Sequence, residues 1–159
     1  MVPHKTERNT TVPLDVPELT LGVVLFFLHF VWEMLQTPFF AEMPFRPHWP
    51  ATLFCLSATL GDVVAGVFAF GCAALLAHHR FWFLAPSRLM ISVYLGVGLL
   101  LTVALELHAI HIAGRWAYSP LMPTIPGLAI GLIPVLQWIL IPLSALAVLR
   151  RLYADVATH

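Results

Sequence analysis

Four strongly polar side chains stand in the interior of long apolar stretches of this sequence: Glu33, Asp62, Glu106 and Gln137. A carboxylate in the hydrocarbon part of a bilayer costs about 2.5 to 3.5 kcal/mol on insertion scales, unless it is protonated, paired or near water. Ionisable groups retained at such a cost are typical of proton-transfer and ligand-binding sites. We therefore take the three acids as candidate catalytic proton donors and Gln137 as a candidate ligand-binding residue.

The first apolar stretch carries a polar stripe. His29, Glu33 and Gln36 follow at i, i+4 and i+7, which places them on one face of a helix. We expect His29 and Gln36 to bind ligand beside Glu33. For His29 alone, a packed helix face whose polar groups bond to neighbouring helices is the favoured interpretation.

The two histidines that follow Glu106 do not complete a metal-binding motif. At roughly 100° per residue, His108 and His111 point about 200° and 140° away from Glu106, so we expect them in the interfacial zone. A metal centre would have to combine side chains from separate helices, for example His29, Glu33, Asp62 and Glu106. No ExxH pair shares a face, so the sequence favours neither a metal nor another cofactor.

Composition indicates what must position these residues. The chain is 60% hydrophobic and 10% charged, with a mean hydropathy of +0.88, which is typical of an integral membrane protein. Four stretches reach the length of about 20 helical residues that a hydrocarbon core requires: 19–40, 51–77, 89–113 and 126–149. The predicted fold class is all-α, a polytopic membrane four-helix bundle.

The connecting segments are too short for a soluble domain. We therefore predict one transmembrane domain at 19–152, a flexible tail at 1–18 and a C-terminal tail at 153–159. Basic residues place both termini in the cytoplasm, with the protein a multi-pass component of the inner membrane. Lys5, Arg8, Arg80, Arg88, Arg150 and Arg151 fall on the cytoplasmic side, and Arg46 and Arg115 on the other. A net charge of zero and the lack of a basic cluster exclude a nucleic-acid partner.

Prolines interrupt two of the predicted helices. Pro126 suits the start of the fourth helix, whereas Pro134 and Pro142 interrupt its hydrogen-bond ladder, as Pro38 does in the first. The carbonyls that they release, those of Ile130, Trp138 and Met34, need protein or water partners in a membrane. A kink that improves packing is an equally good interpretation of each proline.

Two segments on the outer side are rich in aromatic residues and proline, at 43–50 and 114–126. They are expected to cover Glu33 and Glu106 as a lid or an entrance, and we take Trp116 and Tyr118 as ligand-binding candidates. The alternative interpretation is an aromatic belt at the membrane interface.

The C-terminal third carries a recognisable order of residues: an acid that ends an apolar run, a Gly-x-Trp-x-Tyr string, a proline-rich loop and Gly-Leu-Ile-Pro entering a helix. These are Glu106, then Gly114, Trp116 and Tyr118, then Gly131 to Pro134. This order resembles the membrane carotenoid cyclases of the heterodimeric lycopene cyclase type. The resemblance implies a small helical domain that closes rings on a polyene after protonation, with Glu106 at the family's acidic position. The family's acidic pair after the proline is replaced here by Leu136 and Gln137.

The whole chain also resembles small bacterial four-helix membrane proteins of unassigned function. Three functions stay open from the sequence. The first is an enzyme or binding protein for an isoprenoid or other lipid-like ligand, with a buried acid as proton donor. The second is an assembly subunit that bonds to a membrane partner or to another copy of itself. The third is a small proton- or ion-coupled transporter.

Overall fold

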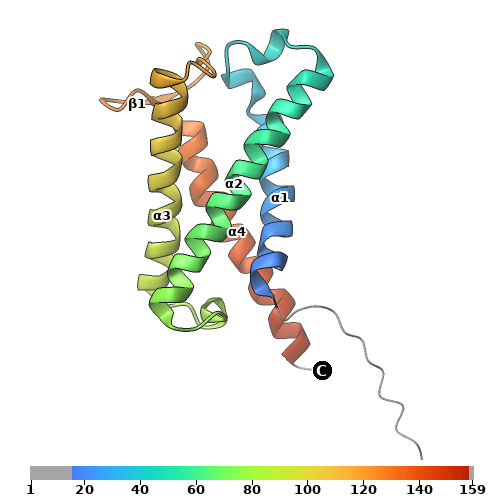
Figure 1. Cartoon of the computed structure of the whole chain (residues 1–159), viewed down its shortest axis with the longest axis vertical. Helices are drawn as coiled ribbons and strands as arrows, with labels where there is room; N and C mark the ends of the chain where they lie inside the picture. The colour runs from blue at the N-terminus through green and yellow to red at the C-terminus, as the bar shows by residue number, and fades with distance from the viewer. Residues whose placement is uncertain (1–15, 158–159) are drawn as a thin grey trace, which may run out of the picture.

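The structure is a computed structural model that describes residues 16–157 and the side chains of residues 16–154. Four long helices form a bundle: α1 (Pro17–Leu35), α2 (His48–Ala77), α3 (Arg88–Leu107) and α4 (Leu132–Ala157) (Figure 1). Each is long and apolar enough to cross a membrane, with α3 counted to Ile112 and α4 to Ala154. The predicted all-α membrane four-helix bundle is therefore confirmed.

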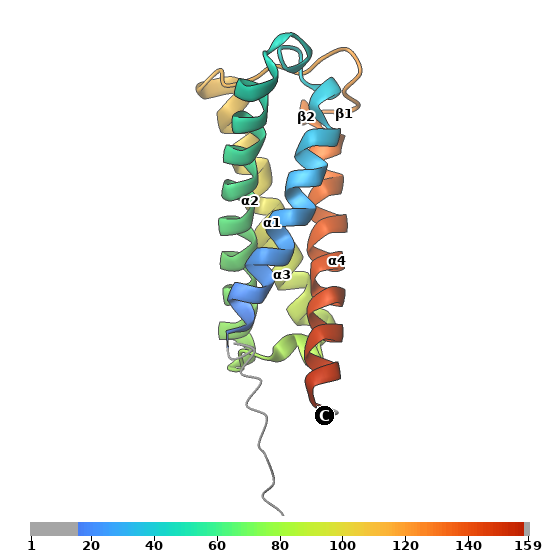
Figure 2. The same ribbon diagram turned by 90° about the vertical axis from the view of Figure 1, so that its right-hand side faces the viewer.

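The start of α1 and the end of α4 lie at one end of the bundle, which we call the terminal end (Figure 2). The opposite end carries residues 36–47 and 108–131, and we call it the loop end. Most of the tail expected at 1–18 lies outside the described residues. At the other terminus α4 continues to Ala157, so most of the tail expected at 153–159 belongs to this helix.

The first helix begins at Pro17 and ends at Leu35, five residues before the predicted end at residue 40. A short 3-10 helix, η1 (Thr37–Phe39), follows because Pro38 has no N–H to continue the α-helical ladder. The Met34 carbonyl that loses this donor accepts a hydrogen bond of 3.0 Å from the Thr37 hydroxyl. A second 3-10 helix, η2 (Met43–Phe45), leads to α2.

At the terminal end, α2 and α3 are joined through the 3-10 helix η3 (Trp82–Leu84). At the loop end, α3 continues into one π-helical turn, η4 (His108–Ile112). Strands β1 (Thr124–Ile125) and β2 (Ile130–Gly131) then pair antiparallel and form a small hairpin over the bundle.

The predicted start of the fourth helix at Pro126 is wrong. Pro126 lies in the hairpin turn, where Gly127 adopts a φ of +84°, and α4 begins at Leu132. Pro134 consequently falls in the first turn of α4, where a backbone N–H would have no partner within the helix, so this proline does not interrupt the ladder. Pro142 does lie inside α4, as predicted.

The terminal half of the bundle is filled by a continuous apolar core. Phe70 packs against Trp82, Phe83 and Tyr94 with ring centroids 5.2 to 6.2 Å apart, and all four side chains are buried. The helices also approach closely at Gly98, where an added Cβ would collide with the indole ring of Trp138. The polar side chains lie in the other half, toward the loop end.

Candidate functional site

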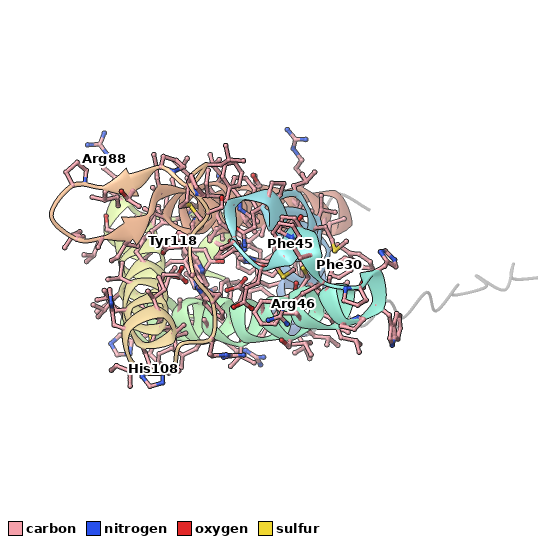
Figure 3. The ribbon with its side chains drawn as sticks, turned by 90° about the horizontal axis from the view of Figure 1, so that it is seen from above. Phe30, Phe45, Arg46, Arg88, His108 and Tyr118 are labelled. Atoms are coloured by element: carbon pink, nitrogen blue, oxygen red, sulfur yellow. The ribbon has the colours of Figure 1, made fainter. Side chains whose placement is uncertain are left out.

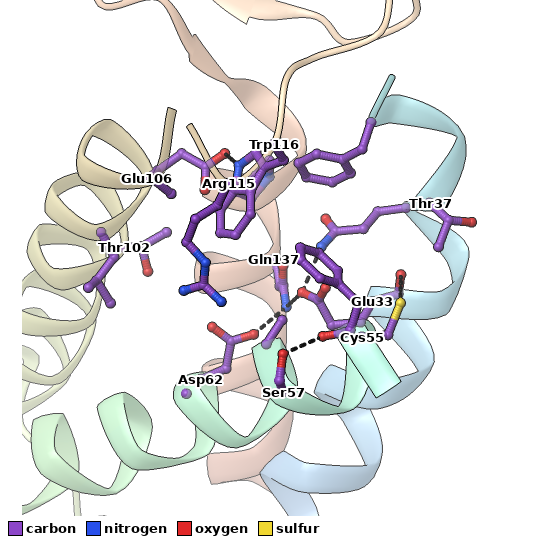
Figure 4. A pocket seen from close by; sticks show the side chains of 18 of the residues that line it. Glu33, Thr37, Cys55, Ser57, Asp62, Thr102, Glu106, Arg115, Trp116 and Gln137 are labelled. Carbon is purple, nitrogen blue, oxygen red and sulfur yellow. Dashed lines mark hydrogen bonds between the residues drawn. The ribbon is translucent and has the colours of Figure 1, made fainter. Parts of the chain in front are cut away.

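A cavity of about 270 Å³ lies between the helices in the loop half of the bundle (Figure 4). Residues from all four long helices and from the loop after η4 line it. Its polar lining includes Glu33 of α1, Asp62 of α2, Glu106 of α3 and Gln137 of α4. The four polar residues that mark the apolar stretches of the sequence thus converge on one space.

Gln137 is the centre of the deeper of two hydrogen-bonded groups. Its side chain is buried, and its Nε2 lies 3.1 Å from Glu33 Oε1 and 3.0 Å from Asp62 Oδ2. The same nitrogen lies 2.8 Å from His29 Nδ1. An amide nitrogen carries two hydrogens, so it serves two of these three atoms at a time.

His29 lies beneath the cavity and is fully buried. Its Nδ1 is 3.2 Å from Asp62 Oδ2, and both atoms lie within hydrogen-bonding distance of Gln137 Nε2. Nδ1 also belongs to the Gln137 group, whereas Nε2 is buried without a partner in the described part of the chain. The histidine thus brings a buried imidazole next to Asp62.

Gln36 completes this group at the loop side. Its Nε2 donates to Glu33 Oε1 at 2.6 Å, and its Oε1 accepts from the indole Nε1 of Trp32 at 3.2 Å. Glu33 Oε1 therefore accepts hydrogen bonds from two amides, those of Gln36 and Gln137.

The second group holds Glu106. Its Oε1 accepts from the Tyr118 hydroxyl at 2.6 Å and from the Trp116 indole at 3.2 Å. Tyr118 in turn accepts a hydrogen bond of 2.8 Å from the backbone N–H of Gly131. Burial, together with the bond to Glu106, raises the pKa of the Tyr118 phenol above its usual range. Figure 3 shows Tyr118 on the inner side of α3 and His108 on its outer side.

An aromatic roof, which we define as Phe40, Phe54 and Trp116, covers the loop end of the cavity. The ring of Trp116 meets Phe40 and Phe54 edge to face, at centroid distances of 6.2 and 5.8 Å. The two loops that carry Phe40 and Trp116 are joined by backbone hydrogen bonds of 2.9 Å, from Ala41 to Ala117 and from Ser119 to Phe39. The roof is therefore held by long-range pairing between the loops.

Arg115 is the cation that the sequence reasoning did not select. Its guanidinium lies 5.3 Å from the Trp116 ring centroid and points into the cavity toward Asp62 (Figure 4). The sequence signal that could have identified Arg115 as a site residue is its position between Gly114 and Trp116. Gly114 adopts a φ of +57°, a backbone conformation that favours glycine, and the turn directs Arg115 inward.

The cavity has a lateral opening between α2 and α3. Two exposed residues of α2, Ser57 and Gly61, and two exposed residues beyond the middle of the α3 span, Leu105 and His108, belong to its lining. The two helices diverge toward the loop end (Figure 1). Toward the terminal end the cavity stops at Trp138 and the apolar core. A molecule therefore reaches the carboxylates from the side, between α2 and α3.

All eight predicted site residues belong to these two groups: His29, Glu33, Gln36, Asp62 and Gln137 to the first, and Glu106, Trp116 and Tyr118 to the second. Their catalytic and ligand-binding roles stay predictions. Within residues 16–157, no three or more His, Cys, Asp or Glu side chains are arranged to hold a metal ion. His108, expected in the interfacial zone, lies at the rim of the cavity and is exposed.

The fold and the site define a class: a multi-pass integral membrane protein with a mostly apolar cavity that carries a few polar groups between its four helices. No family model, no curated protein and no solved structure matches the chain. The resemblance to the lycopene cyclases expected from the residues between Glu106 and Pro134 stays a prediction.

Proposed function

We propose that this protein binds an isoprenoid or another lipid-like molecule in the cavity, with the polar head group of the ligand near Glu33, Asp62 and Glu106. The observation that carries the proposal is a cavity that contains the buried carboxylates of Glu33 and Glu106 and opens between two membrane-spanning helices. Apolar walls with a few convergent polar groups are typical of small-molecule sites. A lipid-like ligand would enter sideways from the bilayer.

The order of residues from Glu106 to Pro134, which resembles that of the lycopene cyclases except at Leu136 and Gln137, supports an isoprenoid as the ligand and a carboxylic acid as the proton donor. In such a reaction Glu106 would donate its proton, and Tyr118 and Trp116 would stabilise the carboxylate that remains through the hydrogen bonds at 2.6 and 3.2 Å.

Two features favour binding over the other functions expected from the sequence. An assembly subunit needs polar groups that face a partner, whereas here the polar side chains bond to one another inside the bundle. A transporter needs access from both ends, whereas the apolar core of the terminal half closes the cavity on that side. We further propose the inner membrane, with the terminal end in the cytoplasm, from the distribution of basic residues.

Native mass spectrometry combined with lipid extraction tests this proposal on the full chain in mild detergent. We expect one apolar molecule per chain, and a lower occupancy in Glu33→Gln and Asp62→Asn. Loss of occupancy in these variants at an unchanged unfolding midpoint would separate binding from folding. An empty wild-type protein that also takes up no added isoprenoid or lipid would overturn the proposal.

A further inference from the structure

The three carboxylates of the cavity share one feature of their bonding. Each uses a single oxygen for its contacts within the protein: Oε1 of Glu33, Oδ2 of Asp62 and Oε1 of Glu106. In the described part of the chain no donor reaches the second oxygen of any of them. Those oxygens are not among the fully buried atoms, so a small molecule can contact them. Glu33 and Glu106 as whole residues are more than nine-tenths buried. Each of the three acids therefore offers one unused oxygen to the cavity, and this oxygen accepts a hydrogen bond when the acid is ionised.

A fourth acceptor and the hydroxyl groups strengthen this imbalance. Gln137 is 2% exposed and lines the cavity, and its Oε1 has no donor among the described residues. The lining hydroxyls of Thr37, Ser57 and Thr102 all donate to backbone carbonyls, at 3.0, 2.8 and 3.0 Å. These hydroxyl protons are therefore not available to a ligand. The cavity is rich in hydrogen-bond acceptors and poor in hydroxyl donors.

The aromatic roof adds an independent preference. Aromatic ring faces attract cations within about 6 Å of their centroids, and more strongly where water is excluded. Arg115 shows this attraction within the molecule, because its guanidinium lies 5.3 Å from the Trp116 ring centroid. This one side chain projects from the exposed loop and brings a positive charge between the roof and Asp62 (Figure 4).

From this arrangement we infer that the head group bound in the cavity is a cation, a protonated amine on an apolar chain. The inference rests on the proposed function and specifies its ligand. The ammonium donates to the unused oxygens of Glu33 and Asp62 beneath the rings of the roof, and the apolar chain extends toward the opening between α2 and α3. Arg115 occupies the mouth of the same cavity and competes with the ligand for Asp62. A carboxylate or phosphate head group would meet three acids and one arginine.

Three molecules that share one apolar tail test the charge of the preferred head group: geranylamine is cationic, geraniol is neutral and geranic acid is anionic. Binding to the full chain in lipid nanodiscs is measured through tryptophan fluorescence, with empty nanodiscs as the background for partitioning. We expect geranylamine to bind at least about tenfold more tightly than geraniol, and geranic acid to bind most weakly. Glu33→Gln and Asp62→Asn should each weaken geranylamine about tenfold and change geraniol far less, which also shows that these variants fold.

Two further variants complete the test. Arg115→Gln should tighten geranylamine, a gain that misfolding cannot produce. Glu18→Gln is the control, because Glu18 lies at the terminal end, pairs with Arg80 at 2.7 Å and does not line the cavity. Geraniol or geranic acid binding as tightly as geranylamine would overturn the inference and leave the proposed function standing. If none of the three binds and no apolar molecule co-purifies, both fail.

Discussion

The Tyr118 hydroxyl donates to Glu106 Oε1 at 2.6 Å, and the hydroxyl oxygen of Tyr118 accepts the backbone N–H of Gly131 at 2.8 Å. Three segments are linked by this one phenol: α3, the loop after η4 and strand β2. An added Cβ on Gly131 would come within 3.0 Å of the Tyr118 ring and 2.8 Å of Met122 Sδ. The glycine therefore lets the hairpin approach closely enough to hold the tyrosine against the acid.

The raised pKa of Tyr118 predicts how its phenol titrates. Burial and the bond to Glu106 favour the neutral phenol in the folded state, so its contribution to stability is complete below a pH of about 10 and falls as the pH rises toward the folded pKa. In an ultraviolet difference titration, wild type and Tyr118→Phe should develop equal phenolate absorbance at a pH of about 10. A larger signal in wild type at that pH would contradict the structure.

Gln137 should be a strong determinant of stability. Gln137→Leu removes the amide that donates to Glu33 and Asp62 and leaves acceptors in the membrane without their partner. We expect a loss of about 1–3 kcal/mol in the free energy of unfolding, measured by titration with a denaturing detergent. Leu140→Ala, a lipid-exposed change on the same helix, should alter it by no more than about 0.5 kcal/mol. Equal effects of the two changes would argue against the network.

Two glycines of α3 should respond differently to the same substitution. Gly98→Ala places a methyl group against the indole of Trp138, which is buried, so overpacking should cost about 1–3 kcal/mol. Gly96 has nothing within 4 Å of the added Cβ, and Gly96→Ala should be neutral or stabilise by up to about 1 kcal/mol. Thermal unfolding monitored by circular dichroism gives the order, and the reverse order would refute the packing described between α3 and α4.

The lateral opening can be narrowed from Gly61. Gly61 lines the cavity on α2, and an added Cβ there meets nothing within 4 Å. Gly61→Leu should therefore slow the binding of geraniol at least about tenfold with little change in unfolding. Gly71→Leu is the control, since Gly71 also has open space on α2 but does not line the cavity. Stopped-flow fluorescence measures both rates, and equal rates would place the entrance elsewhere.

The bundle follows from apolar stretches that are long enough to span a membrane, so the fold class was predictable from hydropathy alone. The polar residues were predictable because Glu33 and Asp62 are costly in such stretches. Their pairing through Gln137 depends on the rotation of three helices, and packing rather than sequence spacing sets that rotation. The prediction of a helix start at Pro126 was wrong because a proline is as compatible with a hairpin turn as with the first turn of a helix. Arg115 was missed because a loop residue gains its direction from the turn at Gly114.

Photo-crosslinking with a diazirine analogue of geraniol tests the central claim most directly, because it locates an apolar ligand on the full chain in a bilayer. The account predicts labelling at cavity residues such as Met43, Phe54 and Trp116, and its loss when unlabelled geraniol competes. Labelling confined to exposed, lipid-facing positions such as Phe27, Val64 and Phe68, and insensitive to competition, would contradict it.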